Sequence, residues 1–182
     1  MQNSLYGPMA PDLWQRFQQV RLLVCDVDGV FSDGRIYLGN DGEELKAFHT
    51  RDGFGVKALR AAGIEVAVIT GRQSRIVADR FQALGVPHVY QGQHDKACAF
   101  GELLDSLKLH GNQVAYIGDD IPDLGLIEAA GLGLAVADAH PLVRQAADYV
   151  TSLPGGFGAV REVCDLLLES QGHSLRPAGA SL

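Results

Sequence analysis

The stretch Arg21-Leu22-Leu23-Val24-Cys25-Asp26-Val27-Asp28-Gly29 decides the fold of this chain. An apolar run without alternation is typical of a strand buried on both faces, as in parallel sheets that helices cover. The run ends in two carboxylates and a glycine. Ligands of open α/β sheets bind beyond the carboxyl ends of the strands, so this end of the strand is where we expect the chemistry.

The rest of the chain alternates strand-like and helix-like segments. Further strands are predicted at 65–69, 88–90, 113–117, 133–136 and 149–150, and helices at 53–62, 73–84, 95–107, 121–130, 141–147 and 158–169. This alternation predicts an α/β fold, a Rossmann-like parallel sheet with helices on both faces. Two short strands at 35–38 and 44–48 flank the turn Gly39-Asn40-Asp41-Gly42, which predicts a β-hairpin inserted after the first strand.

The length of 182 residues suits a single domain, which we expect over residues 1–182. Within it, the hairpin would form a flap over residues 32–50. Residues 171–182 contain Gly, Ser, Pro and Ala without periodicity, which predicts a flexible C-terminal tail.

Charge and composition exclude several classes of partner. The chain carries 15 basic and 22 acidic residues, a net charge of −7, which argues against nucleic acid or an anionic membrane as partner. Cys25, Cys98 and Cys164 lie far apart, so neither a disulfide framework nor a zinc site is indicated. Met1–Val20 lacks the apolar segment of a signal peptide, and no apolar run reaches the ~18 residues of a membrane span. We therefore expect a cytoplasmic protein.

Polar groups follow three further strands. Thr70-Gly71-Arg72 offers a hydroxyl, backbone N–H groups and a guanidinium to an anion. Lys96 begins a helix, where it opposes the helix dipole and requires an anionic neighbour. Gly118-Asp119-Asp120-Ile121-Pro122-Asp123 contains three carboxylates, of which helix capping explains one or two. Taken singly, each group has an ordinary explanation as a turn, a cap or a surface charge.

Taken together, these groups indicate phosphoryl transfer. The strand ends meet at one edge of the sheet, where clustered carboxylates repel each other unless a hard cation lies among them, and Mg²⁺ prefers such oxygen ligands. A hydroxyl and an ammonium beside the cation suit a phosphoryl group. The residues alone leave open which of Asp26 and Asp28 is the nucleophile.

The ordered set Asp26-x-Asp28-Gly29, Thr70-Gly71, Lys96 and Gly118-Asp119-Asp120-x-x-Asp123 resembles the motifs of the haloacid dehalogenase superfamily of aspartate-nucleophile phosphatases, over about residues 21–150. The resemblance implies that Asp26 attacks phosphorus and forms an aspartyl-phosphate, and that Asp28 is the general acid and base. It also implies that Mg²⁺ is bound by Asp26, the backbone carbonyl of Asp28, and Asp119. Thr70 and Lys96 would hold the phosphoryl oxygens, supported by Gly71, Asp120 and Asp123.

The chain leaves no room for a helical cap domain. Between Asp28 and Thr70 there is a hairpin but no helical cap, and only residues 71–95 separate Thr70 from Lys96. In this it is similar to the capless family of 3-deoxy-D-manno-octulosonate 8-phosphate (KDO 8-phosphate) phosphatases. The segments that carry this match are 25–30, 43–48, 51–53, 90–92, 136–141 and 155–162.

This narrower resemblance implies a substrate, a pathway and an assembly. The chain would hydrolyse KDO 8-phosphate, a small anionic sugar phosphate, in lipopolysaccharide precursor synthesis. It would form a homotetramer in which neighbouring subunits cover each active site. The implied substrate positions are Asp28, His49, Thr50, Arg51, Asp52, Gly53, Lys57, Arg72, Arg80 and Lys96. His49 and Lys57 depart from the Asn and Arg expected of the family, and Lys57 keeps the charge without the planar fork.

Two alternatives remain. One is a phosphatase of a related nine-carbon sugar acid phosphate. The other is a non-catalytic oligomerisation domain, of the kind found fused to sugar-acid cytidylyltransferases. The presence of Asp26, Asp28, Thr70, Lys96 and Asp119, with no transferase domain attached, favours an enzyme.

Overall fold

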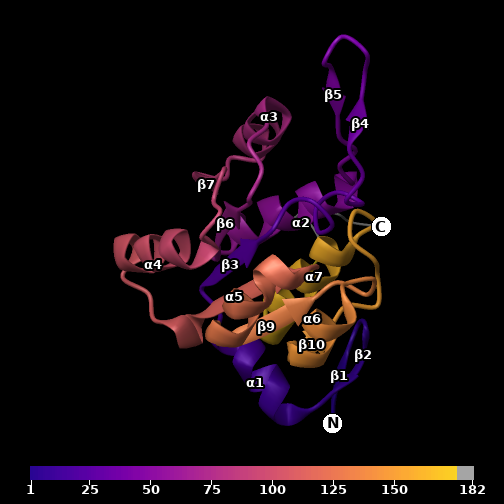
Figure 1. Ribbon diagram of the computed structural model, residues 1–182. Coiled ribbons are helices and arrows are strands. Elements are labelled where there is room, and N and C mark those ends of the chain that lie inside the picture. Colours follow the sequence, from indigo (N-terminus) through magenta and orange to yellow (C-terminus); the bar gives the residue numbers. More distant parts are fainter. Residues whose placement is uncertain (176–182) are drawn as a thin grey trace.

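A six-stranded parallel sheet forms the centre of the computed structural model, which describes residues 1–175 (Figure 1). The strands lie in the order β10-β9-β8-β3-β6-β7. Their bounds are β3 Leu22–Cys25, β6 Glu65–Ile69, β7 His88–Tyr90, β8 Val114–Gly118, β9 Leu132–Ala135 and β10 Tyr149–Val150. Every neighbouring pair is parallel, as the sequence predicted.

Helices cover both faces of the sheet, also as predicted (Figure 1). Their bounds are α1 Pro11–Gln19, α2 Thr50–Ala61, α3 Arg75–Ala83, α4 Lys96–Leu107, α5 Leu124–Ala129, α6 Pro141–Ala146 and α7 Ala159–Ser170. Helix α7 packs against α1 and α2, whereas α5 packs against α4, α6, β8 and β9. In the view of Figure 1, α5 lies in front of the sheet and α7 behind it.

Strand β3 lies at the middle of the sheet and sets the register of the site. All four of its side chains are fully buried, and full burial of a Val or Leu side chain contributes about 1.5–3 kcal/mol. Cys25 at its end pairs with Val68 of β6 and Ile117 of β8. The residues that follow these three strands therefore leave the sheet side by side at its carboxyl edge.

Short 3₁₀ turns shift two of the predicted boundaries. The helix predicted over 121–130 begins as a 3₁₀ turn, Ile121–Asp123, before α5 takes over. Pro122 fits this first turn because its missing N–H would have no partner there. A second 3₁₀ turn, Gly111–Gln113, precedes β8.

The N-terminal segment contributes elements to which the sequence analysis assigned no structure. Strands β1, Gln2–Ser4, and β2, Gly7–Met9, form a small antiparallel hairpin before α1. The Tyr6 hydroxyl in its turn donates to Asp165 of α7 at 2.9 Å. This contact ties the N-terminus to the C-terminal helix.

The predicted insertion forms a hairpin that projects from the body (Figure 1). Its strands, β4 Tyr37–Leu38 and β5 Glu44–Leu45, are shorter than predicted. The side chains of Tyr37, Leu38 and Leu45 are 49%, 73% and 55% exposed. A two-stranded hairpin alone is marginal in water, which is a reason for so short a ladder.

The C-terminal segment begins with a fixed turn. The Gln171 side-chain amide donates to the carbonyls of Phe17 and Val20, at 3.3 and 2.9 Å. Most of the tail predicted as flexible, residues 176–182, lies outside the described residues. Among residues 1–175, no helix has the length and apolar character needed to cross a bilayer.

Candidate active site

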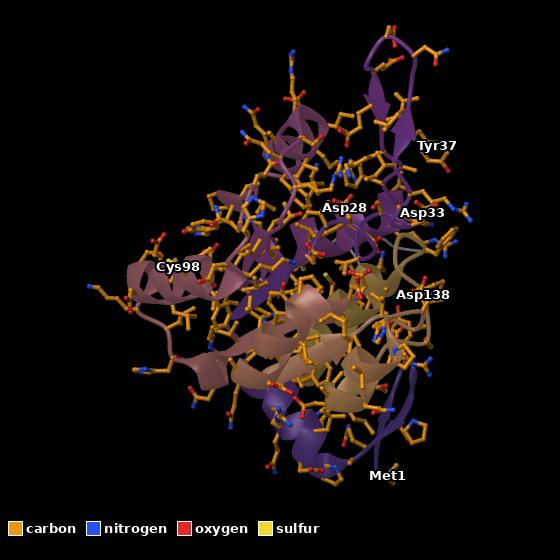
Figure 2. All side chains as sticks on the ribbon, in the orientation of Figure 1. Met1, Asp28, Asp33, Tyr37, Cys98 and Asp138 are labelled. Carbon is orange, nitrogen blue, oxygen red and sulfur yellow. The ribbon has the colours of Figure 1, made fainter. Side chains whose placement is uncertain are left out.

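The carboxyl edge of the sheet holds a cavity of about 300 Å³ that collects the predicted catalytic groups. Its lining comes from the ends of β3, β6 and β8 and from the start of α4. The lining residues are Asp26, Asp28, Gly34, Thr70, Gly71, Arg72, Lys96, Asp119, Asp120, Pro122 and Asp123. Asp28 lies between the body and the projecting hairpin, which carries Tyr37 (Figure 2).

Lys96 links two carboxylates at the floor of this cavity. Its ammonium lies 3.0 Å from Asp26 Oδ1 and 2.6 Å from Asp123 Oδ1, and only 6% of its side chain is exposed. Asp95 caps α4 by accepting from two backbone N–H groups, and so fixes where Lys96 leaves the helix. Burial lowers the pKa of Lys96, but Asp26 and Asp123 outweigh it and leave this pKa raised. Lys96 is therefore a fixed positive charge beside Asp26.

Asp123 is a structural acceptor for the whole site. Its Oδ1 accepts from Lys96 and, at 2.6 Å, from the Tyr116 hydroxyl. Its Oδ2 accepts the N–H groups of Asp119 and Asp120, at 3.1 and 3.4 Å. Both oxygens thus have protein donors, which suits Asp123 to orient Lys96 and the loop after β8.

A hard cation fits the carboxylates at this edge. Asp26, Asp119 and Asp123 each bring one carboxylate oxygen to within 4.8 Å of the others. Burial and then the neighbouring Asp26 and Asp123 raise the pKa of Asp119 to about 8. Burial and then Asp123 raise the pKa of Asp26 to about 6, against the opposing effect of Lys96. Since Asp123 is already saturated with donors, Asp26 and Asp119 are the side chains left to bind the cation.

Two glycines allow the loop after β3 to pack closely. Gly29 has a φ of +91°, and a Cβ there would clash with the carboxylate of Asp119. Gly155 lies against the carbonyl of Gly29, so closely that a Cβ would have no room. The Gly155 N–H donates to Asp138 at 2.9 Å, which holds this second loop in place.

The hairpin contributes a cation to the site that sequence analysis missed. The Lys46 ammonium forms an ion pair with Asp28 Oδ1 and lies 3.5 Å from Glu44 Oε1. Arg72 approaches Asp28 and Glu44, each at 3.9 Å. The only signal was a lysine in the predicted hairpin strand. Tyr116 was missed as well, although it is a polar tip in an apolar strand just before the acidic motif.

The remaining predicted substrate residues lie outside this cavity. Thr50, Gly53, Lys57 and Arg80 line another cavity of about 300 Å³, which shares no lining residue with the first. Arg51 is exposed on the first turn of α2.

His49 and Asp52 have local structural roles at the start of α2. His49 Nδ1 accepts the N–H of Arg51 at 3.1 Å and so caps α2. Asp52 is buried and accepts the N–H of Arg161 in α7 at 2.8 Å. Within one chain, the predicted substrate positions therefore form two separate groups.

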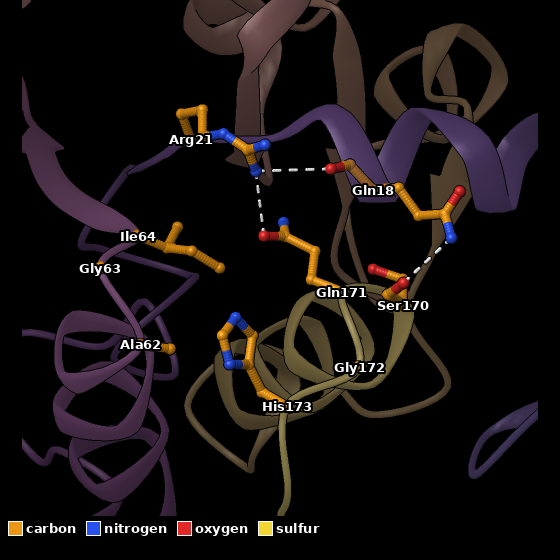
Figure 3. Close-up of a pocket in the computed structure, with 9 residues that line it drawn as sticks. All are labelled: Gln18, Arg21, Ala62, Gly63, Ile64, Ser170, Gln171, Gly172 and His173. Atoms are coloured by element: carbon orange, nitrogen blue, oxygen red, sulfur yellow. Dashed lines mark hydrogen bonds between the residues drawn. The ribbon is translucent and has the colours of Figure 1, made fainter.

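The largest described cavity, about 690 Å³, lies at the opposite edge of the sheet (Figure 3). Gln18, Arg21, Ile64, Gln171 and His173 are among its lining residues. Arg21 and Ile64 directly precede β3 and β6, so this cavity faces the amino ends of the strands. Among residues 1–175, no carboxylate side chain lines it, so the smaller cavity is the candidate active site.

Comparison with known proteins identifies the family of the chain. The chain matches the haloacid dehalogenase-like hydrolase family over residues 86–154. It is 53% identical over 180 residues to the 3-deoxy-D-manno-octulosonate 8-phosphate phosphatase KdsC of Yersinia pestis, covering 99% of this chain and 96% of that one.

Solved structures give the same result. A crystal structure of the Yersinia pestis phosphatase superposes with a TM-score of 0.92 and 55% identity, over 93% of this chain and 92% of that one. The Moraxella catarrhalis phosphatase, solved in complex with magnesium, phosphate and KDO, superposes with a TM-score of 0.88 and 43% identity. That match covers 90% of this chain and 94% of the other.

Proposed function

The chain belongs to the KDO 8-phosphate phosphatase family of the haloacid dehalogenase-like hydrolases, and on this premise we propose that it hydrolyses KDO 8-phosphate to KDO and phosphate. The observation that carries the proposal is one cavity that unites Asp26, Asp28, Thr70, Lys96 and Asp119. The released KDO would serve lipopolysaccharide precursor synthesis.

Asp26 is the nucleophile of the proposed reaction. One of its oxygens attacks phosphorus, the bond from phosphorus to the sugar oxygen breaks, and an aspartyl-phosphate forms. The ammonium of Lys96, 3.0 Å from Asp26 Oδ1, neutralises the carboxylate as the phosphoryl group approaches. Thr70 and Lys96 hold the phosphoryl oxygens.

Asp28 moves the protons. It lines the same cavity as Asp26 and protonates the departing sugar oxygen. The resulting carboxylate then takes a proton from the water that hydrolyses the aspartyl-phosphate, which restores both residues. Gly29 gives the loop the sharp turn that lets the two aspartates serve one phosphoryl group.

Magnesium completes the site. When bound by Asp26, Asp119 and the backbone carbonyl of Asp28, Mg²⁺ would offset the negative charge of the phosphoryl oxygens and carboxylates. Two residues of the acidic loop would have supporting roles: Asp123 orients Lys96, and Asp120 caps the turn that follows β8 by accepting the N–H of Ile121 at 2.8 Å. Gly71 lines the cavity beside Thr70.

We further propose a homotetramer in which subunits complete each other's sites. The exposed apolar side chains of the hairpin favour a contact between copies. The sugar-acid part of the substrate then meets the second group of predicted positions, His49 to Gly53, Lys57 and Arg80, from a neighbouring subunit. Arg80 and Lys57 would supply positive charge for the substrate carboxylate. The three free cysteines fit a cytoplasmic enzyme.

Phosphate release from a panel of phosphomonoesters tests the activity. We expect the highest kcat/KM for KDO 8-phosphate, lower values for a nine-carbon sugar acid 9-phosphate and for hexose 6-phosphates, and loss of turnover in EDTA with recovery on adding Mg²⁺. A preference for the nine-carbon acid would transfer the assignment to that substrate. Hydrolysis of none of these esters would leave the oligomerisation domain as the function.

A further inference from the structure

We propose that Lys46 is a positioning residue that holds Asp28, the general acid and base, against the hairpin. The inference rests on the proposed phosphatase function, because it assigns Lys46 a role through Asp28. Lys46 is not among the predicted site residues, and it does not line the cavity.

The burial of Lys46 is the first observation. None of its side chain is exposed, and its ammonium pairs with Asp28 Oδ1 and lies 3.5 Å from Glu44 Oε1. An ammonium removed from water is stable only where carboxylates compensate it. Glu44 Oε1 is itself buried without a hydrogen-bond partner, so Lys46 is its compensating charge.

The charge balance is the second observation. When Asp28 is a carboxylate, it and Glu44 bring two negative charges, and Lys46 and Arg72 bring two positive charges within 4 Å of them. Without Lys46, this side of the cavity would carry excess negative charge towards an incoming phosphate dianion. Like charges at such distances repel, most strongly where water is excluded.

The geometry of Asp28 is the third observation. Lys46 occupies Oδ1, while among the described residues Oδ2 has only the more distant Arg72 Nε, at 3.9 Å. The carboxyl group is thereby held with one oxygen towards the hairpin and the other left to exchange a proton with the substrate. A proton donor acts efficiently only when it is held within hydrogen-bond reach of the leaving oxygen.

A comparison of leaving groups separates positioning from a merely structural role. We compare kcat/KM of wild type and of Lys46→Met with two substrates. KDO 8-phosphate is an alkyl ester, and p-nitrophenyl phosphate is an aryl ester. The alkoxide must be protonated as it leaves, whereas p-nitrophenolate leaves without a proton. We therefore expect kcat/KM for the alkyl ester to fall at least about tenfold more than that for the aryl ester. Lys46→Arg should restore part of the lost ratio.

Controls keep the result interpretable. Arg35→Met removes an exposed cation of the same hairpin, 76% exposed and paired only with Asp33 among described contacts, and should leave the ratio unchanged. Lys46→Gln replaces Lys46→Met if that variant fails to fold, as judged by circular dichroism and solution mass. Equal losses for both esters, or no loss, would overturn the inference. If wild type prefers another alkyl phosphate, the proposed substrate fails, and the ratio is measured with that ester.

Discussion

Asp123 connects Lys96, the lysine that we propose binds phosphate, to the central sheet. It accepts from Lys96, from Tyr116 in β8 and from two backbone N–H groups. The negative charge is what holds a buried ammonium in place, since a neutral acceptor of the same shape leaves that ammonium poorly compensated.

We predict that Asp123→Asn lowers kcat/KM by about 10- to 100-fold, because a hydrogen bond to a charged group is worth about 1.5–3 kcal/mol. Tyr116→Phe is the matched control: it removes a neutral donor to the same carboxylate oxygen and should cost about 1.5–3 kcal/mol of unfolding free energy, with a smaller kinetic effect. Steady-state kinetics and urea unfolding measure both. Wild-type activity in Asp123→Asn would contradict this role for the carboxylate.

At the scale of elements, Asp52 joins the first turn of α2 to the start of α7. The N-cap of α7 is Gly158, which has no side chain to accept a hydrogen bond. Asp52 accepts the Arg161 N–H in its place. Burial raises the pKa of Asp52 to about 6 from its ordinary value of 3.8, and the hydrogen bond from Arg161 only partly opposes this. The folded protein therefore holds this proton more tightly than the unfolded chain does.

This shift predicts a pH dependence of stability. Between about pH 4 and pH 6 the unfolded chain has lost the proton that the folded state keeps, so stability falls as the pH rises through this window. Asp52→Asn does not titrate at this position and is the reference. Relative to it, the free energy of unfolding of wild type should fall by up to about 3 kcal/mol between pH 4 and pH 7. Urea unfolding at both pH values measures the difference. A difference that does not change with pH would contradict the assignment.

The loop that contains Gly155 packs against the loop that contains Gly29. Gly155 leaves no room for a Cβ beside the carbonyl of Gly29. We predict that Gly155→Ala displaces the loop after β3, lowers kcat at least about tenfold and costs about 1–3 kcal/mol of stability, as overpacking does. Gly101→Ala is the control, because Gly101 lies inside α4 with nothing within 4 Å of a Cβ. That change should be neutral or slightly stabilising. Equal effects of the two substitutions would contradict the prediction.

At the scale of the whole molecule, residues 1–175 form the candidate catalytic cavity and no lid over it. The hairpin projects away from the body with Leu38 and Leu45 exposed (Figure 1). Two of the predicted substrate positions, Lys57 and Arg80, face a different cavity of the same chain. Both observations favour an assembly in which the active site is completed by a second copy.

We predict a solution mass of about four times the 19.5 kDa of one chain. The double substitution Leu38→Asp with Leu45→Asp should give monomers and remove most activity towards KDO 8-phosphate, because charges at an apolar contact are costly to bury. Light scattering and phosphate release measure both properties. A wild-type monomer with full activity would contradict the shared site.

Local sequence patterns were sufficient to predict the sheet and the group of residues at its carboxyl edge. The apolar runs before Asp26, Thr70 and Asp119 predicted buried parallel strands, and parallel strands bring their carboxyl ends to one edge. For most of the predicted helices, the predicted and observed ends differ by no more than two residues. Helix ends depend on capping contacts, which the sequence pattern does not fix.

The amino-acid sequence alone determined which residues follow each strand, and hence the type of chemistry at the carboxyl edge of the sheet. Only the tertiary structure decided the placement of Lys46 on Asp28 and of Asp52 on α7, and the separation of Arg80 from the catalytic cavity. The physical reason is distance along the chain. Asp52 and Arg161 are 109 residues apart in the sequence. Their contact results from the packing of two helices, and no periodic pattern in the sequence predicts it.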